Sequence, residues 1–199
     1  MKINAITIER EYGSGGTEIA RRLSEETGIA CYGPEILEEV SKEQGISVDA
    51  IQRYEETTTN SFLYSLYVMA KASSGDSDML TKEGHIFVAE QRVIKQLAMN
   101  GPAIFLGHCA SEALKEQKKV IRVFIRCTDD AQKRARIETE YGIRASDVDR
   151  TAKRFDKKRS NYYYANTGQK WDNYGNYDIV LDSAALGIEG CVSVLKGLV

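Results

Sequence analysis

A short apolar strand that leads into a glycine-rich turn and then a helix is the feature that most constrains this chain. Residues 3–8 form the predicted strand, Gly13, Gly15 and Gly16 follow, and a helical pattern ends at Gly28. Such a turn directs successive backbone N–H groups and the positive end of the helix toward one point, which favours a phosphate. We therefore expect an anion-binding loop. The alternative is a glycine-rich turn that binds nothing.

The remainder of the chain alternates between predicted strands and helices. The later strands are expected at 29–32, 102–106, 120–126 and 177–181, with helices between them and after the last one. This alternation is typical of a parallel sheet with both faces covered by helices. A chain of 199 residues is long enough for one such domain. We expect a single α/β domain over 1–199, with a five-stranded parallel sheet in three α/β/α layers.

The net charge bears on whether nucleic acid is a partner, and the cysteine spacing bears on zinc binding and on the cellular compartment. The net charge of -2 disfavours nucleic acid, although residues 133–159 carry a run of lysines and arginines. That run is either a local basic site or a solvated helix face. No apolar stretch is long enough for a membrane span, so we expect no membrane. The four cysteines show no CxxC spacing, which favours reduced thiols in a cytoplasmic protein over a zinc site.

The glycine-rich turn can be aligned with the nucleotide-binding pattern G-x-x-x-x-G-K-[ST], in which the lysine reaches the β- and γ-phosphates. Arg10 then takes the first glycine position and Gly15 the second. Gly16 takes the lysine position and Thr17 the Ser/Thr position. The turn therefore matches the pattern at Gly15 and Thr17, and it lacks both the first glycine and the lysine.

Four segments, in order, carry a likeness that covers nearly the whole chain. They are ITIEREYGSGGTEIARRLSEETGIACYGPEILEEV, PAIFLGHCASEAL, RCTDDAQKRARIETEYGI and FDKKRSNYYYANTGQKWDNYGNYDIVLDSAALGIEGCV. The first resembles the start of the cytidylate-kinase-like family of P-loop proteins, which also has an I-S-R-E-Y-G-S-G-G loop without lysine. The others resemble that family's strand before Gly-Arg, the strand and helix before its lid, and its basic lid helix with the final strand.

The resemblance implies a P-loop NTPase-type fold with a helical acceptor-binding insert at 52–99 and a basic helical lid within 134–175. It implies a phosphotransferase that uses Mg²⁺ with ATP and moves the γ-phosphoryl group to a nucleoside monophosphate such as CMP. The alternative is a nucleotide-binding sensor or partner-binding protein with little or no kinase activity. The missing lysine favours that alternative, and the retained lid arginines favour the kinase.

The same resemblance assigns roles to individual residues. It places Gly13, Ser14, Gly15, Gly16 and Thr17 at the donor phosphates, with the Thr17 hydroxyl as a candidate Mg²⁺ ligand. It matches Arg136, Arg154 and Arg159 to the lid arginines that act in catalysis. Arginine suits this role because its planar fork can meet phosphate oxygens in a bidentate manner.

Two departures from the family pattern bear on activity. Where cytidylate kinases proper have Asp-Gly-Arg after the third strand, this chain has Leu106, Gly107 and His108. The His108 side chain either donates a hydrogen bond to a phosphate or is a polar cap on the strand. The second departure is the missing lysine. Arg10 could supply that positive charge as a catalytic cation, or it could instead form an ion pair with a neighbouring glutamate.

Aromatic side chains gather in two regions. Tyr54, Phe62, Tyr64 and Tyr67 lie in the acceptor segment, where they either flank a base or pack in the core. The run 162–164 and the rings at 171 and 174 follow the basic helix. They could stack on a base, form a lid hinge or form the interface of a homodimer.

Overall fold

The computed structural model describes residues 3–57 and 82–199, and within them it shows a five-stranded, fully parallel sheet. The strand order is β2 (Ala30–Tyr32), β3 (Ala103–Leu106), β1 (Ala5–Arg10), β4 (Val120–Arg126) and β5 (Ile179–Asp182). The predicted fold class is therefore confirmed. The expected helix and loop at 61–81, with Phe62, Tyr64 and Tyr67, lie outside the described residues.

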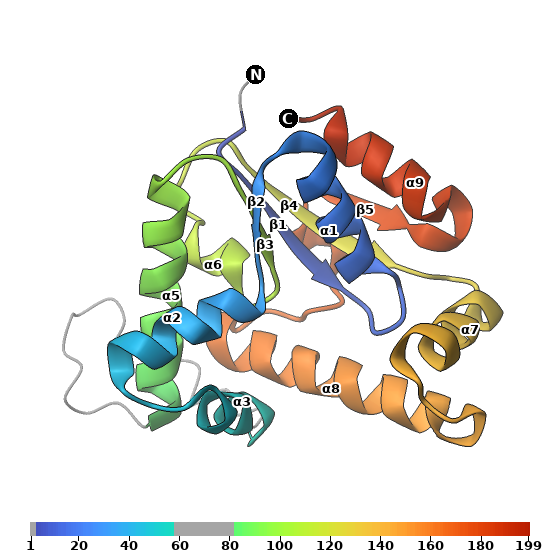
Figure 1. Cartoon of the computed structure of the whole chain (residues 1–199), viewed down its shortest axis with the longest axis horizontal. Helices are drawn as coiled ribbons and strands as arrows, with labels where there is room; N and C mark the ends of the chain where they lie inside the picture. Colours follow the sequence, from blue (N-terminus) through green and yellow to red (C-terminus); the bar gives the residue numbers. More distant parts are fainter. Residues whose placement is uncertain (1–2, 58–81) are drawn as a thin grey trace.

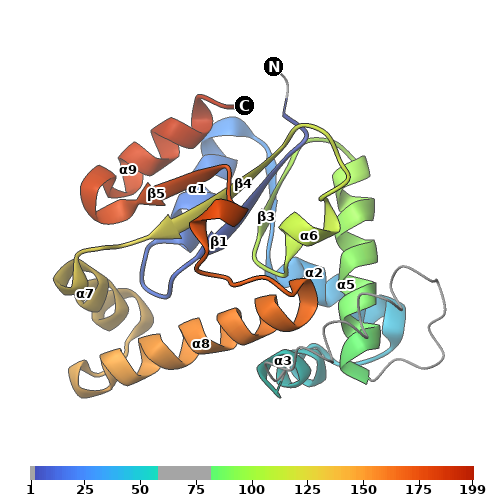
Figure 2. The same ribbon diagram turned by 180° about the vertical axis from the view of Figure 1, so that it is seen from behind.

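Helices cover both faces of the sheet (Figures 1 and 2). One face carries α1 (Gly16–Thr27) and α9 (Ser183–Lys196). The other carries α2 (Pro34–Gln44), α3 (Val48–Thr57), α5 (Lys82–Met99) and α6 (Ala110–Ala113). Beyond the ends of β1 and β4 lie α7 (Asp130–Tyr141) and the long α8 (Val148–Thr167). Two short 3₁₀ turns, Ala145–Asp147 and Tyr174–Asn176, complete the described elements.

The amphipathic pattern of α1 explains how its face of the sheet is covered. Ile19, Ala20 and Leu23 are fully buried and pack with Cys191 and Leu195 of α9 against the strands. These positions recur at helical spacing, so they form one apolar stripe. Full burial of a Leu or Ile side chain stabilises a fold by about 1.5–3 kcal/mol. The stripe therefore fixes α1 on the sheet, and with it the turn that precedes α1.

Four of the five strands differ from their predicted ranges, each by at most two residues at either end. The first strand begins at Ala5 instead of Ile3, because pairing with β3 and β4 starts there. The helix expected after the last strand begins at Ser183, since the Asp182 side chain accepts a hydrogen bond from the Ala184 N–H and caps it. That helix is kinked at Gly187, whose φ is 67°.

The chain termini and the glycine-rich turn lie at opposite ends of the sheet (Figure 1). The turn follows the carboxyl end of β1, where parallel α/β sheets bind their ligands. In the part of the chain that the structure describes, no helix is both long and apolar enough to cross a membrane. The position of the turn indicates a ligand site at the carboxyl ends of β1 and β3.

Candidate active site

The loop between β1 and α1 has the shape that an anion-binding turn requires. Gly13 and Gly15 have φ values of +77° and +79°, which side chains rarely tolerate. The Ser14 hydroxyl donates to the Glu11 carbonyl at 2.8 Å and accepts from the Gly16 N–H at 3.3 Å. The N-cap position of α1 is Gly15, which has no side chain to offer as a cap. The backbone at this helix terminus is thus held in place without a protein anion.

Arg136 approaches this loop from α7. Its Nη1 donates to the Gly13 carbonyl at 2.6 Å, and its side chain lies beside Gly15. Glu11 fixes the other side of the loop, because its carboxylate accepts from Lys133 Nζ at 3.0 Å and from the Cys127 N–H at 3.1 Å. The predicted lid arginine Arg136 therefore lies against the backbone of the glycine-rich loop.

Helix α8 is docked directly on the loop. The Asp156 carboxylate accepts a hydrogen bond from the Tyr12 N–H at 2.7 Å. The Tyr12 ring stacks on Phe155 with centroids 4.6 Å apart and an interplanar angle of 5°. Arg159 Nη1 donates to the Arg10 carbonyl at 2.9 Å. The basic helix that the resemblance assigns to the lid thus contacts the glycine-rich turn.

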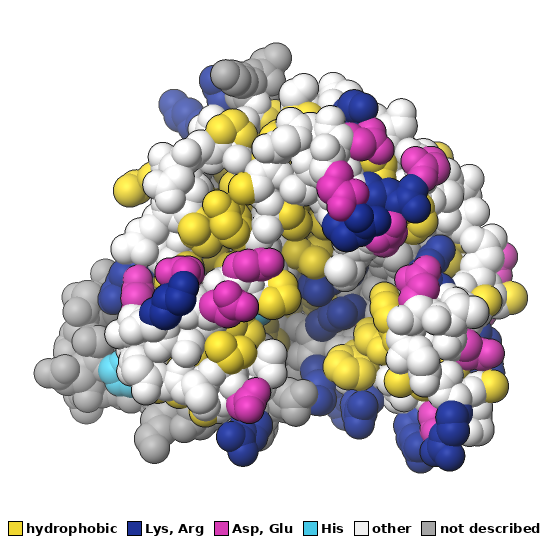
Figure 3. All heavy atoms as spheres, in the orientation of Figure 1, with side chains coloured by type: hydrophobic (Ala, Val, Ile, Leu, Met, Phe, Trp, Pro, Cys, Tyr) yellow, Lys and Arg dark blue, Asp and Glu magenta, His cyan; other side chains and the backbone are white. Residues whose placement is uncertain are grey.

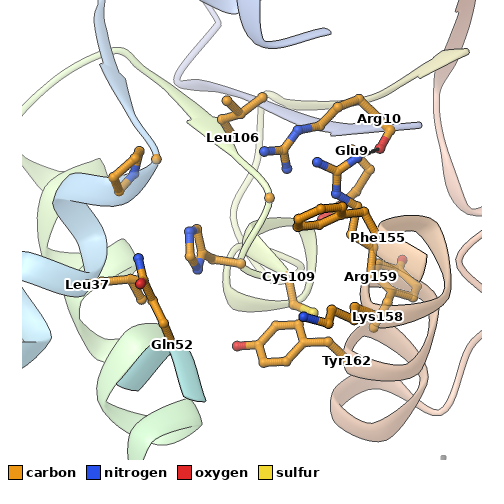
Figure 4. Close-up of a pocket in the computed structure, with 15 residues that line it drawn as sticks. Glu9, Arg10, Leu37, Gln52, Leu106, Cys109, Phe155, Lys158, Arg159 and Tyr162 are labelled. Atoms are coloured by element: carbon orange, nitrogen blue, oxygen red, sulfur yellow. Dashed lines mark hydrogen bonds between the residues drawn. The ribbon is translucent and has the colours of Figure 1, made fainter. Parts of the chain in front are cut away.

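A pocket of about 470 Å³ opens beside these contacts. Its apolar walls come from α2, β3 and α8, and Gln52 of α3 lies across from α8 (Figure 4). Three cationic side chains line it, namely Arg10, Lys158 and Arg159. Figure 3 shows Lys and Arg side chains inside a hollow on the same face as α1. The pocket combines an apolar surface with concentrated positive charge, as a site for an organic anion requires.

Arg10 is the most unusual of these cations. Its Nε is buried, and no described residue accepts a hydrogen bond from it. Burial, and then the nearby Arg159 charge, lowers the pKa of Arg10 to about 10, so the group stays protonated at neutral pH. Within the described residues Arg10 forms no ion pair with Glu9 or Glu11, and Glu11 pairs instead with Lys133. Two repelling guanidinium groups at one pocket favour the binding of an anion between them.

Glu9 lies in the same pocket and was not selected from the sequence as a site residue. It is only 7% exposed, and its carboxylate accepts a hydrogen bond from Trp171 Nε1 at 3.2 Å. Burial raises its pKa, although the Arg10 charge and the Trp171 bond oppose that rise. Because Leu106 occupies the position of the family's aspartate, Glu9 is the carboxylate that this pocket retains on the neighbouring strand.

His108 is held in the pocket by strained backbone and a buried acid. Gly107, His108 and Cys109 have successive φ values of 79°, 55° and 51°, and left-handed non-glycine residues of this kind cluster at functional sites. His108 Nδ1 lies 3.7 Å from Glu90 Oε2. The same oxygen accepts a hydrogen bond from the Tyr162 hydroxyl. Glu90 is fully buried, so it orients two side chains of the pocket at once.

The structure brings together some of the predicted site residues and separates others. Arg10, His108 and Arg159 share the pocket, whereas Arg154 is exposed and its guanidinium lies 5.1 Å from the Phe155 ring centroid. Five residues on a helix turn the side chain by about 140° beyond a full turn, which explains the separation. Lys158 lies in the pocket although the sequence did not distinguish it from its neighbours.

The residues present fit a Mg²⁺ ion that is held mainly by substrate. Thr17 is exposed in the first turn of α1, directly after the loop. The described residues contain no group of three or more His, Cys, Asp or Glu that could form a protein cage for a metal. Mg²⁺ in kinases keeps several waters and binds substrate phosphates with few protein ligands. A hydroxyl at this position is compatible with that arrangement.

Solved structures with a similar fold cover nearly the whole chain. The chain is similar to a crystal structure of an uncharacterized protein from Eubacterium ventriosum, with 23% identity, a TM-score of 0.72 and coverage of 98% and 97% of the two chains. It is also similar in fold to shikimate kinase from Bacteroides thetaiotaomicron, with 12% identity, a TM-score of 0.51 and the same coverages. No curated protein sequence gives a significant match.

The sequence supports a narrower assignment than the fold does. The model of the cytidylate kinase-like family matches residues 5–185, which include the phosphate loop, the pocket and the basic helix. The chain therefore belongs to the cytidylate kinase-like family.

Proposed function

We propose that this protein is a phosphotransferase that moves the γ-phosphoryl group of ATP to a nucleoside monophosphate such as CMP. One observation carries the proposal: a pocket with three cationic side chains opens beside the glycine-rich loop at the carboxyl end of β1. Such an enzyme must bring two polyanions together, and phosphoryl transfer leaves the protein mainly the tasks of positioning and charge stabilisation.

The donor would bind at the loop Gly13–Thr17 and be flanked by Arg136. The backbone N–H groups of the loop and the start of α1 would receive its phosphates. The Thr17 hydroxyl would hold Mg²⁺, and the ion would neutralise charge on the phosphates. Arg136 already donates to the loop backbone, so it is positioned to respond to the donor.

The acceptor would bind in the pocket. Its phosphate would meet Arg159 and Lys158, while the rings of Phe155 and Tyr162 and the amide of Gln52 offer an apolar and hydrogen-bonding surface for a base. In this proposal segment 52–99 contributes the acceptor side and segment 134–175 the lid. Exclusion of water by the docked helix α8 would protect the transferred group from hydrolysis.

A coupled assay of ADP release over a panel of nucleoside monophosphates tests the proposal. We expect Mg²⁺-dependent turnover with at least one of them, with CMP as the first candidate. ATP binding is measured in parallel by calorimetry. If the protein binds ATP and transfers nothing to any monophosphate, the nucleotide-binding alternative replaces the kinase.

Substitutions in α8 show whether the pocket cations act in the chemical step. Arg159→Ala should lower turnover on the order of 10³-fold with a smaller effect on ATP affinity, because a contact made mainly in the transition state lowers kcat. Lys157→Ala, an exposed neighbour, is the matched control for lost charge. Arg154→Ala shows whether that arginine leaves Phe155 during turnover. Equal effects from all three substitutions would show that the loss reflects general positive charge on α8 and not a specific contact of Arg159.

A further inference from the structure

The two loop positions at which this chain departs from G-x-x-x-x-G-K-[ST] are in contact with each other. Gly16 stands at the lysine position and Arg10 at the first glycine position. A Cβ atom added to Gly16 would lie 2.6 Å from Arg10 Cβ and 2.9 Å from Arg10 Cγ. The position of the Arg10 Cβ atom is fixed by the backbone of β1, so no change of rotamer can move it aside. A side chain at position 16 and an arginine at position 10 therefore exclude each other.

The course of the Arg10 side chain shows where its charge goes. It leaves the end of β1 and extends toward β3, near Leu106 (Figure 4). Its Nη1 lies 2.6 Å from the point where a Cβ on Gly107 would stand. The guanidinium thus crosses from the phosphate loop to the pocket, and glycines at both 16 and 107 leave room for it.

We propose that the cation of the P-loop has been exchanged between two positions: Arg10 carries it in place of the usual lysine, and Gly16 at the lysine position leaves room for it. Arg10 binds the donor's terminal phosphate from the end of β1 and also reaches the acceptor phosphate in the pocket. Three observations support this. The base of Arg10 fills the space where a side chain of residue 16 would start, its guanidinium lines the pocket, and its buried Nε has no hydrogen-bond acceptor among the described residues. The acceptor part rests on the proposed function, whereas the donor part does not.

A double-mutant cycle on stability tests the steric part of the exchange. Gly16→Ala should lower the Tm of the wild-type protein by about 4 °C or more, since the new methyl group overlaps the Arg10 stem. In an Arg10→Gly background the same substitution should leave the Tm unchanged or raise it. Equal destabilisation in the two backgrounds would overturn the exchange. This readout needs no substrate.

ATP affinity tests the functional part. Arg10→Gly should weaken ATP binding about 10- to 100-fold, as loss of a charge-assisted contact does. The double variant Arg10→Gly/Gly16→Lys restores the full pattern at unchanged net charge, and should bind ATP within about threefold of wild type. The nearest remaining atom to the new Cβ is Ile125 Cβ at 3.4 Å, which a small shift accommodates. Gly16→Lys alone should bind ATP no better than Arg10→Gly.

The KM for the nucleoside monophosphate acceptor distinguishes the contact of Arg10 with the acceptor phosphate from its contact with the donor phosphate. A lysine at position 16 restores the donor contact only, so the double variant should keep an acceptor KM at least about tenfold above wild type. A normal acceptor KM in the double variant would refute the acceptor contact. A double variant with wild-type Tm that binds ATP no better than Arg10→Gly would refute the donor contact. If ATP binding follows the exchange and no monophosphate is phosphorylated, the donor part stands and the proposed kinase function fails.

Discussion

The hydrogen bond between Asp156 and the Tyr12 N–H gives the most specific prediction about how α8 is attached to the phosphate loop. Asp156→Ala leaves that N–H without its acceptor at a partly buried position. An unsatisfied buried donor costs about 1–3 kcal/mol, and we expect a loss of about 2 kcal/mol in the free energy of unfolding. For a chain of this size that corresponds to a decrease in Tm of about 4–8 °C. Thermal and urea unfolding both measure it.

Asp156→Asn keeps a side-chain oxygen that can accept the hydrogen bond from the Tyr12 N–H and removes the negative charge. Burial raises the pKa of Asp156, although the Tyr12 bond and Lys133 oppose that rise. A raised pKa in the folded state means that the associated stability is present at low pH and is lost as pH rises through that pKa. The Asn variant should therefore match wild type in acid and equal or exceed it at pH 7. Asp149→Ala is the control, because its carboxylate is 63% exposed on the same helix. If Asp156→Ala costs no more than Asp149→Ala, the docking argument is refuted.

Two further predictions concern the loop and the pocket carboxylate. Gly15→Ala and Gly28→Ala both place a side chain at positive φ, but Gly15→Ala should cost more stability, because its Cβ would overlap Ile188 whereas nothing lies within 4 Å of one on Gly28. Only Gly15→Ala should abolish ATP binding, because that overlap displaces the backbone of the glycine-rich loop. Equal ATP affinity in the two variants would contradict this. Glu9→Gln should raise the Tm more at pH 8 than at pH 4, because burial raises the pKa of Glu9 and wild type loses stability as that group ionises. The glutamine oxygen can still accept from Trp171, so a pH-independent difference would contradict the assignment.

The local elements of this protein were predictable because their signals are local. Apolar runs predicted the strands, and Gly13, Gly15 and Gly28 marked the turn and the end of α1, where the structure has its left-handed residues. Alignment with the nucleotide-binding pattern also predicted Arg10 as a cation that could replace the missing lysine. These predictions depend on backbone preferences within a few residues, which a sequence displays directly.

The contacts that assemble the site were not predictable in the same way. Trp171 donates to Glu9 across a separation of 162 residues, and Asp156 accepts from Tyr12 across 144. No periodicity relates such pairs, because only the packing of α8 and the segment after it against the sheet brings them together. The direction of Arg159 into the pocket depends on that packing as well. Arg159 was a candidate from the sequence, whereas the parts played by Glu9 and Asp156 emerge only from the tertiary structure.

Trp171 has a practical consequence for experiments on this protein. It is the sole tryptophan in the sequence, it is buried, and its indole N–H bonds to a carboxylate that lines the pocket. Indole emission responds to the polarity and charge around the ring, so tryptophan emission, excited selectively over the eleven tyrosines, originates at one reporter beside the pocket. Ligand occupancy can thus be followed optically in the unlabelled protein, in real time, with neither turnover nor an attached dye.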